Sequence, residues 1–270
     1  MPILPISERS SIIINERINT MRLIETLTSK LDELTHHYGL VALKGGTEVE
    51  DMTFGELLFL KEIAINIPVI VKIGGPEARN DIRYCQSIAI DGILAPMIES
   101  EYALENFIAA ITDIYHNTKL PYLAVNIETI TAYHNLSAIY TNSYFSYINQ
   151  ITVGRSDLSQ SMKKCVDDDD VLYVTANIIK AAKLSGKITS VGGQINPSNA
   201  EIVQKIIQPD RINTRHLVFD CTKSDNIAKS IQLGLEFELD LYRAFSNVEP
   251  SKSHIYQKRI AVTFDRLAIV

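Results

Sequence analysis

The chain has 270 residues, of which 46% are hydrophobic, and a formal net charge of −6 without any block of basic residues. This charge argues against nucleic acid or an anionic membrane surface as a partner. The hydrophobic content suffices for one large core or two small ones, and no linker rich in Gly, Pro or Ser divides the chain, so we predict a single domain.

The cysteines and the N-terminal stretch favour a cytoplasmic protein. Cys85, Cys165 and Cys221 lie far apart and match neither CxxC nor a paired framework, which suits a reducing compartment. The opening MPILPISERSS lacks the basic-then-apolar pattern of a signal peptide, and no apolar run approaches the length that spans a bilayer. We therefore expect no membrane partner.

The N-terminal segment, residues 1–37, reads as a strand followed by a helix. Residues 11–15 form a short apolar run compatible with a strand. From residue 17 to 37 apolar side chains recur mostly at three- and four-residue steps, which is a helical period. Residues 40–43 then predict a strand that ends at the Gly45-Gly46 turn.

A strand-plus-helix unit repeats through the following residues, 38–246. Predicted strands start near residues 40, 68, 92, 122, 150, 187 and 215, and helices are expected at 53–65, 79–89, 101–115, 168–184, 198–207 and 224–246. Seven such units, and an eighth if residues 11–15 pair, predict an α/β (β/α)8 TIM barrel. The rival is an open doubly wound sheet, whose G-x-G-x-x-G fingerprint is absent from this sequence. Residues 247–270 are a C-terminal extension expected to pack on the barrel or on a neighbouring subunit.

Two acidic residues, Glu128 and Asp157, each follow a short apolar run rich in β-branched residues. They stand about one strand-plus-helix unit apart, so a parallel sheet would project both into one cleft. Paired carboxylates repel one another there, and a divalent cation that prefers oxygen, Mg2+ or Mn2+, removes that penalty. The alternative is that Glu128 caps the next helix and Asp157 turns a loop.

The predicted strand ends form a polar rim of mixed acids and bases. Such a rim fits a small anionic substrate bound to a metal. Its members are Lys44, Glu48, Lys72, Glu99, Asn126, Glu128, Arg155, Asp157, Gly192, Gly193 and Asp220.

Four blocks of the sequence, PVIVKIGG, GILAPMIES, LAVNIETITAY and ITVGRSDLSQSM, carry a family resemblance over about residues 38–220. They resemble the corresponding blocks of the HpcH/HpaI aldolase and citrate lyase family, barrel enzymes of the phosphoenolpyruvate/pyruvate type. The resemblance implies that Glu128 of the IET block and Asp157 of the G-x-x-D-L-S block hold a divalent metal. It also implies a homo-oligomeric lyase or aldolase that acts on a small 2-keto acid or acyl carboxylate through a metal-stabilised enolate.

The same resemblance implies roles for residues around the two carboxylates. The backbone N–H groups of Ser156 and Asp157 would hold the substrate carboxylate. Asn126 stands where family members often carry an amide beside the metal glutamate; its alternative is to satisfy a loop backbone. Lys72 replaces an arginine that contacts substrate oxygens in the pyruvate aldolases, so it keeps the charge but loses the bidentate fork. Glu48 is the candidate general base on a loop where those aldolases carry a histidine.

Two further residues remain open between a functional and a structural role. Arg155 is predicted either to contact a second anionic group of the substrate or to pair across the rim with Glu128 or Glu99. Gly193, in the Gly192-Gly193 pair, either leaves N–H groups free to bind an anion or makes a tight turn.

Two other functions compete with the metal-dependent lyase. The absence of the usual histidine is compatible with a non-catalytic ligand-binding or assembly subunit on the same barrel. The citrate lyase branch suggests an acyl-CoA lyase, for which the sequence shows no basic pocket.

Overall fold

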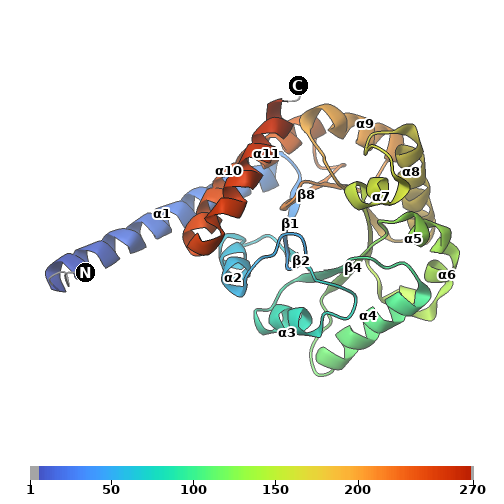
Figure 1. The fold of residues 1–270 in the computed structure, drawn as a ribbon, viewed down its shortest axis with the longest axis horizontal. Coiled ribbons are helices and arrows are strands. Elements are labelled where there is room, and N and C mark those ends of the chain that lie inside the picture. The colour runs from blue at the N-terminus through green and yellow to red at the C-terminus, as the bar shows by residue number, and fades with distance from the viewer. Residues whose placement is uncertain (1–5, 269–270) are drawn as a thin grey trace.

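The computed structural model describes the backbone of residues 6–268 and the side chains of residues 21–268. Eight strands form a closed barrel in sequence order, and helices surround it (Figure 1). The predicted barrel is therefore confirmed, and the open doubly wound sheet is excluded. The strands are β1 (Leu40–Gly46), β2 (Val69–Lys72), β3 (Gly92–Ala95), β4 (Tyr122–Asn126), β5 (Gln150–Gly154), β6 (Ile188–Gly192), β7 (Arg211–Asn213) and β8 (Leu217–Asp220).

The helices predicted at 53–65, 79–89, 101–115, 168–184, 198–207 and 224–246 lie close to the observed ranges, whereas those at 130–134, 136–141, 155–162 and 253–268 were not predicted. Capping side chains mark several of the helix starts. Thr53 shows this best: its side chain accepts the N–H of Glu56 while the Glu56 carboxylate accepts the N–H of Thr53. The helices are α1 (Ile6–His37), α2 (Phe54–Ile63), α3 (Arg79–Ser87), α4 (Glu101–Ile114), α5 (Ile130–His134), α6 (Leu136–Thr141), α7 (Arg155–Met162), α8 (Asp169–Leu184), α9 (Pro197–Ile207), α10 (Ile227–Val248) and α11 (Ser253–Ala268), with 3-10 turns η1 (Ser143–Tyr147) and η2 (Pro250–Lys252).

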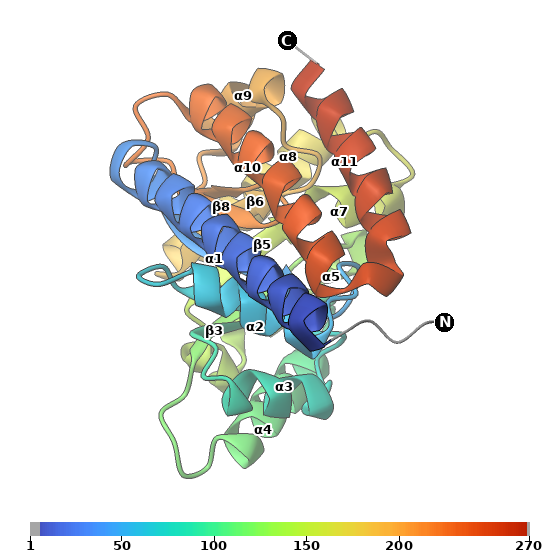
Figure 2. The ribbon, with the colours of Figure 1, turned by 90° about the vertical axis from the view of Figure 1, so that its left-hand side faces the viewer.

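The strand predicted at residues 11–15 is wrong, because these residues lie inside helix α1. A short apolar run has the same appearance in a strand and in a buried helix, so periodicity alone does not separate them. Helix α1 crosses the outside of the barrel next to α10, and its first turns extend beyond the ring of helices (Figures 1 and 2).

The sequence pattern predicted seven of the eight strands, and the strand that it missed is β7. It has only three residues and follows α9 after a short loop. No helix separates it from β8, and β8 runs antiparallel to both β7 and β1, whereas the strands from β1 to β7 are parallel. The regular βα repeat therefore ends at β7.

The reversed direction of β8 corrects the predicted rim. Asp220 ends β8, but its N–H bonds to the carbonyl of Gly39, just before the start of β1. Asp220 therefore lies at the opposite end of the barrel from Glu128. The turn between β7 and β8, which carries Arg215 and His216, lies at the rim instead.

The C-terminal extension forms α11, which packs on this chain's own barrel beside α10 (Figure 2). Arg259 donates to the carbonyls of Val49 and Glu50 in the loop after β1, and Arg266 donates to the carbonyl of Ile195 after β6. Of the two predicted locations, the structure thus shows the barrel.

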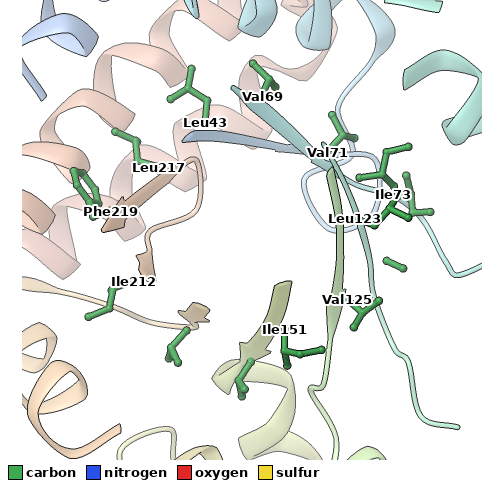
Figure 3. Packing of buried hydrophobic residues seen from close by; sticks show 14 of the residues in the cluster. Leu43, Val69, Val71, Ile73, Leu123, Val125, Ile151, Ile212, Leu217 and Phe219 are labelled. Carbon is green, nitrogen blue, oxygen red and sulfur yellow. The ribbon is translucent and has the colours of Figure 1, made fainter. Parts of the chain in front are cut away.

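The main core lies between the sheet and the helices. Side chains from neighbouring strands, such as Val71, Val125 and Ile151, point outward and are fully buried (Figure 3). Burying each of them stabilises the fold by roughly 1.5–3 kcal/mol. A smaller cluster fills the barrel interior and consists of Ala42, Ile70, Leu94, Ala124 and Val218.

Strand alternation links this interior cluster to the site. Lys72 stands two residues after Ile70, and Asn126 stands two residues after Ala124. Since side chains two apart on a strand face the same side, both polar groups point into the barrel at its upper end. Within residues 6–268, no helix combines the length and the apolarity needed to cross a bilayer.

Gly234 allows α10 to approach β8 closely, and this yields a prediction. A Cβ at this position would lie 2.9 Å from two ring carbons of the buried Phe219. Helix propensity favours alanine by about 1 kcal/mol, but overpacking a rigid core costs about 1–3 kcal/mol. We expect Gly234→Ala to lower the free energy of unfolding in urea titrations.

Gly55 provides the matched control, because a Cβ in that first turn of α2 would meet its nearest atoms only at 3.8 and 3.9 Å. Gly55→Ala should leave stability unchanged or slightly raised. Equal effects of the two substitutions would refute the packing explanation.

Candidate active site

Two carboxylates, those of Glu128 and Asp157, converge at the end of β4 and β5. Glu128 is 1% exposed and stands two residues after the end of β4. Asp157 lies in the first turn of α7, where the positive end of the helix dipole favours a negative charge. A Cβ added to Gly154 would lie 2.5 Å from Glu128 Oε2 and 3.6 Å from Asp157 Oδ2. Both oxygens therefore lie close to the backbone of Gly154, and the two carboxylates converge on this residue.

Glu128 does not cap the helix that follows it, as the alternative interpretation would require. Thr129 performs that function, because its hydroxyl accepts the N–H of Ala132 at 3.1 Å. The carboxylate of Glu128 is instead held by two donors. Its Oε1 accepts the N–H of Met97 at 3.0 Å, and its Oε2 accepts the side-chain amide of Asn126 at 2.6 Å.

Met97, which sequence reasoning assigned no role, adopts a left-handed backbone conformation with φ of 53°. This conformation is uncommon for a residue with a Cβ, and such residues cluster at functional sites. Here it directs the backbone N–H after β3 toward Glu128. No sequence signal marks this residue, because the conformation depends on the contact with a different strand.

Asn126 carries its amide beside Glu128, as the resemblance implied, and does not satisfy a loop backbone. Its amide nitrogen binds Glu128, and its Oδ1 is buried without a hydrogen-bond partner. An orphaned buried acceptor costs free energy unless a ligand satisfies it. Asn126 therefore orients the carboxylate and presents an acceptor to the same part of the barrel.

Lys72 supplies positive charge to two acidic residues of the predicted site, Glu48 and Glu128. Its Nζ lies 2.6 Å from Glu48 Oε2 and 3.5 Å from Glu128 Oε2. Burial alone would lower the pKa of Lys72, but the negative charges of Glu128, Glu48 and Asp157 outweigh it, so the net pKa is raised. Lys72 is therefore charged at neutral pH.

The charge balance around Glu128 remains unfavourable despite Lys72. Burial raises the pKa of Glu128 to about 7, with a further contribution from Asp157, while Lys72 and the two hydrogen bonds oppose the shift. A second positive charge between the carboxylates would stabilise both in their ionised form. The donor set, two converging carboxylates, is of the type that a hard divalent cation such as Mg2+ or Mn2+ prefers. Among residues 21–268, no group of three or more His, Cys, Asp or Glu side chains is arranged to hold a metal ion.

Arg155 makes its contacts away from the two carboxylates, although only Ser156 separates it from Asp157 in the chain. Its side chain is fully buried, with Nη1 2.8 Å from Asp167 Oδ1 and Nη2 donating to the carbonyl of Gly193 at 3.0 Å. The ion pair is thus with Asp167, not with Glu128 or Glu99 as the alternative predicted. We now expect Arg155 to fix the turn after β6, because its charge is already paired.

Gly193 approaches the start of α7 closely. A Cβ on it would lie 2.5 Å from the backbone nitrogen of Ser156 and 3.0 Å from the Ser156 hydroxyl oxygen. Its φ of +95° also favours glycine. The turn predicted as an alternative is present, and the absence of a side chain lets the Gly193 backbone lie close to the donors of Ser156.

Two further polar residues, Lys44 and His216, lie at the rim. Sequence reasoning placed Lys44 there without a specific role and did not consider His216 part of the site. Lys44 follows Ala42 by two residues, so strand alternation places it in the barrel; the sequence contained that signal. Burial lowers the pKa of Lys44; Glu50 opposes this shift and Lys72 adds to it. The His216 ring is fully buried, and its Nδ1 lies 2.9 Å from the carbonyl of Lys44.

The fold was compared with solved structures, after no protein-family model and no curated protein matched the chain by sequence. The chain shares its barrel fold with solved structures that include HpcH/HpaI aldolase/citrate lyase family proteins. A HpcH/HpaI aldolase/citrate lyase family protein from Burkholderia cenocepacia is similar with a TM-score of 0.52 and 12% identity, over 62% of this chain and 84% of that one.

Two further structures show the same similarity. RipC from Yersinia pestis has a TM-score of 0.51 and 12% identity, over 70% of this chain and 87% of that one. The citrate synthase SbnG has a TM-score of 0.52 and 16% identity, over 72% of this chain and 81% of that one. At these identities the similarity establishes a shared fold. The resemblance predicted from the sequence blocks is therefore confirmed for the fold.

The environment of His216 predicts a pH dependence of stability. Burial lowers the pKa of His216 to about 4, whereas the unfolded chain titrates near its usual value of about 6.5. The unfolded state therefore binds a proton first as the pH falls, and stability present above pH 6.5 is lost toward pH 4. Between pH 7 and pH 5 this group should remove about 2 kcal/mol from the free energy of unfolding.

Urea titrations of the wild type and of His216→Gln at both pH values check this. Other groups titrate equally in the two proteins, so the loss on acidification should be smaller by that amount in the variant. Parallel losses would show that His216 is not held neutral by burial.

Proposed function

We propose that this protein is a metal-dependent carbon–carbon lyase or aldolase that acts on a small 2-keto acid or acyl carboxylate. The observation that carries the proposal is the convergence of Glu128 and Asp157 at Gly154, where an added Cβ would lie 2.5 Å from Glu128 Oε2 and 3.6 Å from Asp157 Oδ2. The fold shared with the aldolase and citrate lyase structures supports the same reaction class.

In this proposal Glu128 and Asp157 hold Mg2+ or Mn2+. When bound, the ion supplies Lewis-acid stabilisation for the negative charge that develops on the keto oxygen as the carbon–carbon bond breaks or a proton leaves. Asn126 and the N–H of Met97 keep Glu128 in position. Because these partners are themselves fixed by strands β3 and β4, the ligand carboxylate needs little reorganisation.

The substrate carboxylate is proposed to lie beside the start of α7. Ser156 provides a backbone N–H and a hydroxyl there, and the helix dipole favours a negative charge. Gly193 keeps this space free. Lys72, charged and 10% exposed in its side chain, faces Glu128 and is placed to neutralise a second substrate oxygen.

Two side chains are candidates for the proton transfer. Glu48 contacts Lys72 and lies on the loop after β1, as the predicted general base requires. Lys44 is the second candidate, because its lowered pKa increases the fraction of neutral amine that accepts a proton.

The second candidate function is a ligand-binding or assembly subunit without turnover. The contact between Glu48 and Lys72 favours it, because a carboxylate in an ion pair is a weaker base than a free one. In that case a keto acid would bind beside the metal without exchanging its protons. An acyl-CoA lyase remains the third possibility and would share the same two carboxylates.

Substitution of the carboxylates tests the catalytic proposal. In Glu128→Ala and in Asp157→Ala, the Mg2+-dependent exchange of pyruvate methyl protons with deuterated solvent, followed by NMR, should fall roughly a thousandfold. EDTA should have the same effect on the wild type. Glu101→Ala, which removes an exposed carboxylate from the start of α4, serves as the control and should retain full exchange.

Circular dichroism verifies that the variants are folded. Exchange that persists in EDTA would refute the metal-dependent reaction. Keto acid binding by calorimetry without any exchange in the wild type would instead favour the subunit without turnover.

Gly193 tests the location of the substrate carboxylate. Its replacement by alanine should weaken oxalate binding in the presence of Mg2+ by about tenfold, because the new methyl group would occupy the space beside Ser156. Gly192→Ala is the matched control, since its Cβ would meet the nearest atom at 3.6 Å. Calorimetry and thermal melts of both variants separate binding from folding, and equal oxalate affinities would place the carboxylate elsewhere.

A further inference from the structure

A cavity of about 360 Å³ lies between α10, α11 and the turn from β7 to β8. Apart from one tyrosine, every ionisable side chain that lines it is an arginine, a lysine or a histidine. Among the residues that the structure describes, no acidic side chain lines this cavity. The arginine, lysine and histidine side chains are Arg215, His254, Lys258, Arg259 and Arg266. Four permanent cations around one cavity are unexpected in a chain whose net charge is −6.

Two of the three arginines form ion pairs with glutamates. Arg215 Nη1 lies 3.2 Å from Glu50 Oε1, and Arg266 Nη1 lies 3.8 Å from Glu238 Oε2. Both glutamates are buried behind the cavity. They offset two of the four positive charges, so the lining keeps a positive excess.

Arg259 gives a second, independent indication of a ligand. Its Nη2 donates to the carbonyls of Val49 and Glu50, which fixes the guanidinium, while its Nη1 is buried without a partner. A buried charged donor without an acceptor is costly, and an anionic oxygen is the acceptor that a guanidinium binds best.

Lys258 completes the cation set at the outer side. Its side chain is exposed on α11 and belongs to no ion pair among the described side chains. An unpaired ammonium beside three oriented guanidinium groups offers more charge than a single carboxylate neutralises. Phosphate groups, with several acceptor oxygens and up to two charges each, match this arrangement.

We propose that the cavity under α11 is a binding site for a small phosphate-bearing anion. Its volume falls in the range of small-molecule pockets, about 300–1,000 Å³. A cavity of this size favours a small ligand over a membrane or a nucleic acid, which need a broad surface. The site is separate from Glu128 and Asp157, but Arg259 binds the loop that also carries Glu48.

Calorimetric titration with inorganic pyrophosphate in EDTA tests the site without metal or keto acid. The wild type should bind, and Lys258→Glu should weaken the affinity by about tenfold or more through charge repulsion. Lys180→Glu makes the same change of charge at an exposed position on α8 and should bind like the wild type. Binding should also weaken with added salt.

A second variant tests whether the anion binds under α11 or in the candidate active site. Lys72→Gln removes the cation of the candidate active site and should leave pyrophosphate binding intact if the anion lies under α11. Absence of binding, equal affinities of Lys258→Glu and Lys180→Glu, or loss only in Lys72→Gln would each overturn the proposal. Titration with ADP distinguishes the source of the phosphate: tighter binding than pyrophosphate indicates a nucleotide-linked group, and weaker binding indicates free phosphate.

Discussion

The structure of the rim depends on one electrostatic constraint, the burial of Glu128 close to Asp157. A carboxylate that is 1% exposed next to another acid is unfavourable unless positive charge and hydrogen-bond donors surround it. Lys72 provides charge, and Asn126 and Met97 provide donors. The strands β2, β3 and β4 must therefore end at one place and in one orientation, which their parallel pairing in the barrel achieves.

The same constraint explains why glycine stands at Gly154 and Gly193. In both cases an added Cβ would collide with a functional group: it would lie 2.5 Å from Glu128 Oε2 at Gly154, and 2.5 Å from the Ser156 nitrogen at Gly193. Arg155 supports this arrangement indirectly, because its buried guanidinium joins Asp167 to the carbonyl of Gly193. The site is thus shaped as much by absent side chains as by the polar ones.

The reversed strand β8 gives the barrel a second feature. Its direction brings Arg215 and His216 to the rim and sends Asp220 to the far end. Helix α11 then closes over this side, with Arg259 and Arg266 bonded to backbone carbonyls of the loops after β1 and β6. The C-terminal segment is therefore part of the rim, and through Arg259 it contacts the loop that carries Glu48.

The sequence by itself determined the barrel class, seven of the eight strands, most helix limits and the pair Glu128 and Asp157. These features are local: alternating or helical periodicity, caps such as Thr53, and polar residues directly after apolar runs. Tertiary structure alone decided the helical state of residues 11–15, the three-residue strand β7, the direction of β8, and the partner of Arg155. Each of these depends on which distant segment lies opposite, and a run of residues carries no record of its neighbours in space. The basic cavity under α11 belongs to the second kind, because Arg215 and Arg259 meet only when the chain end folds back over the barrel.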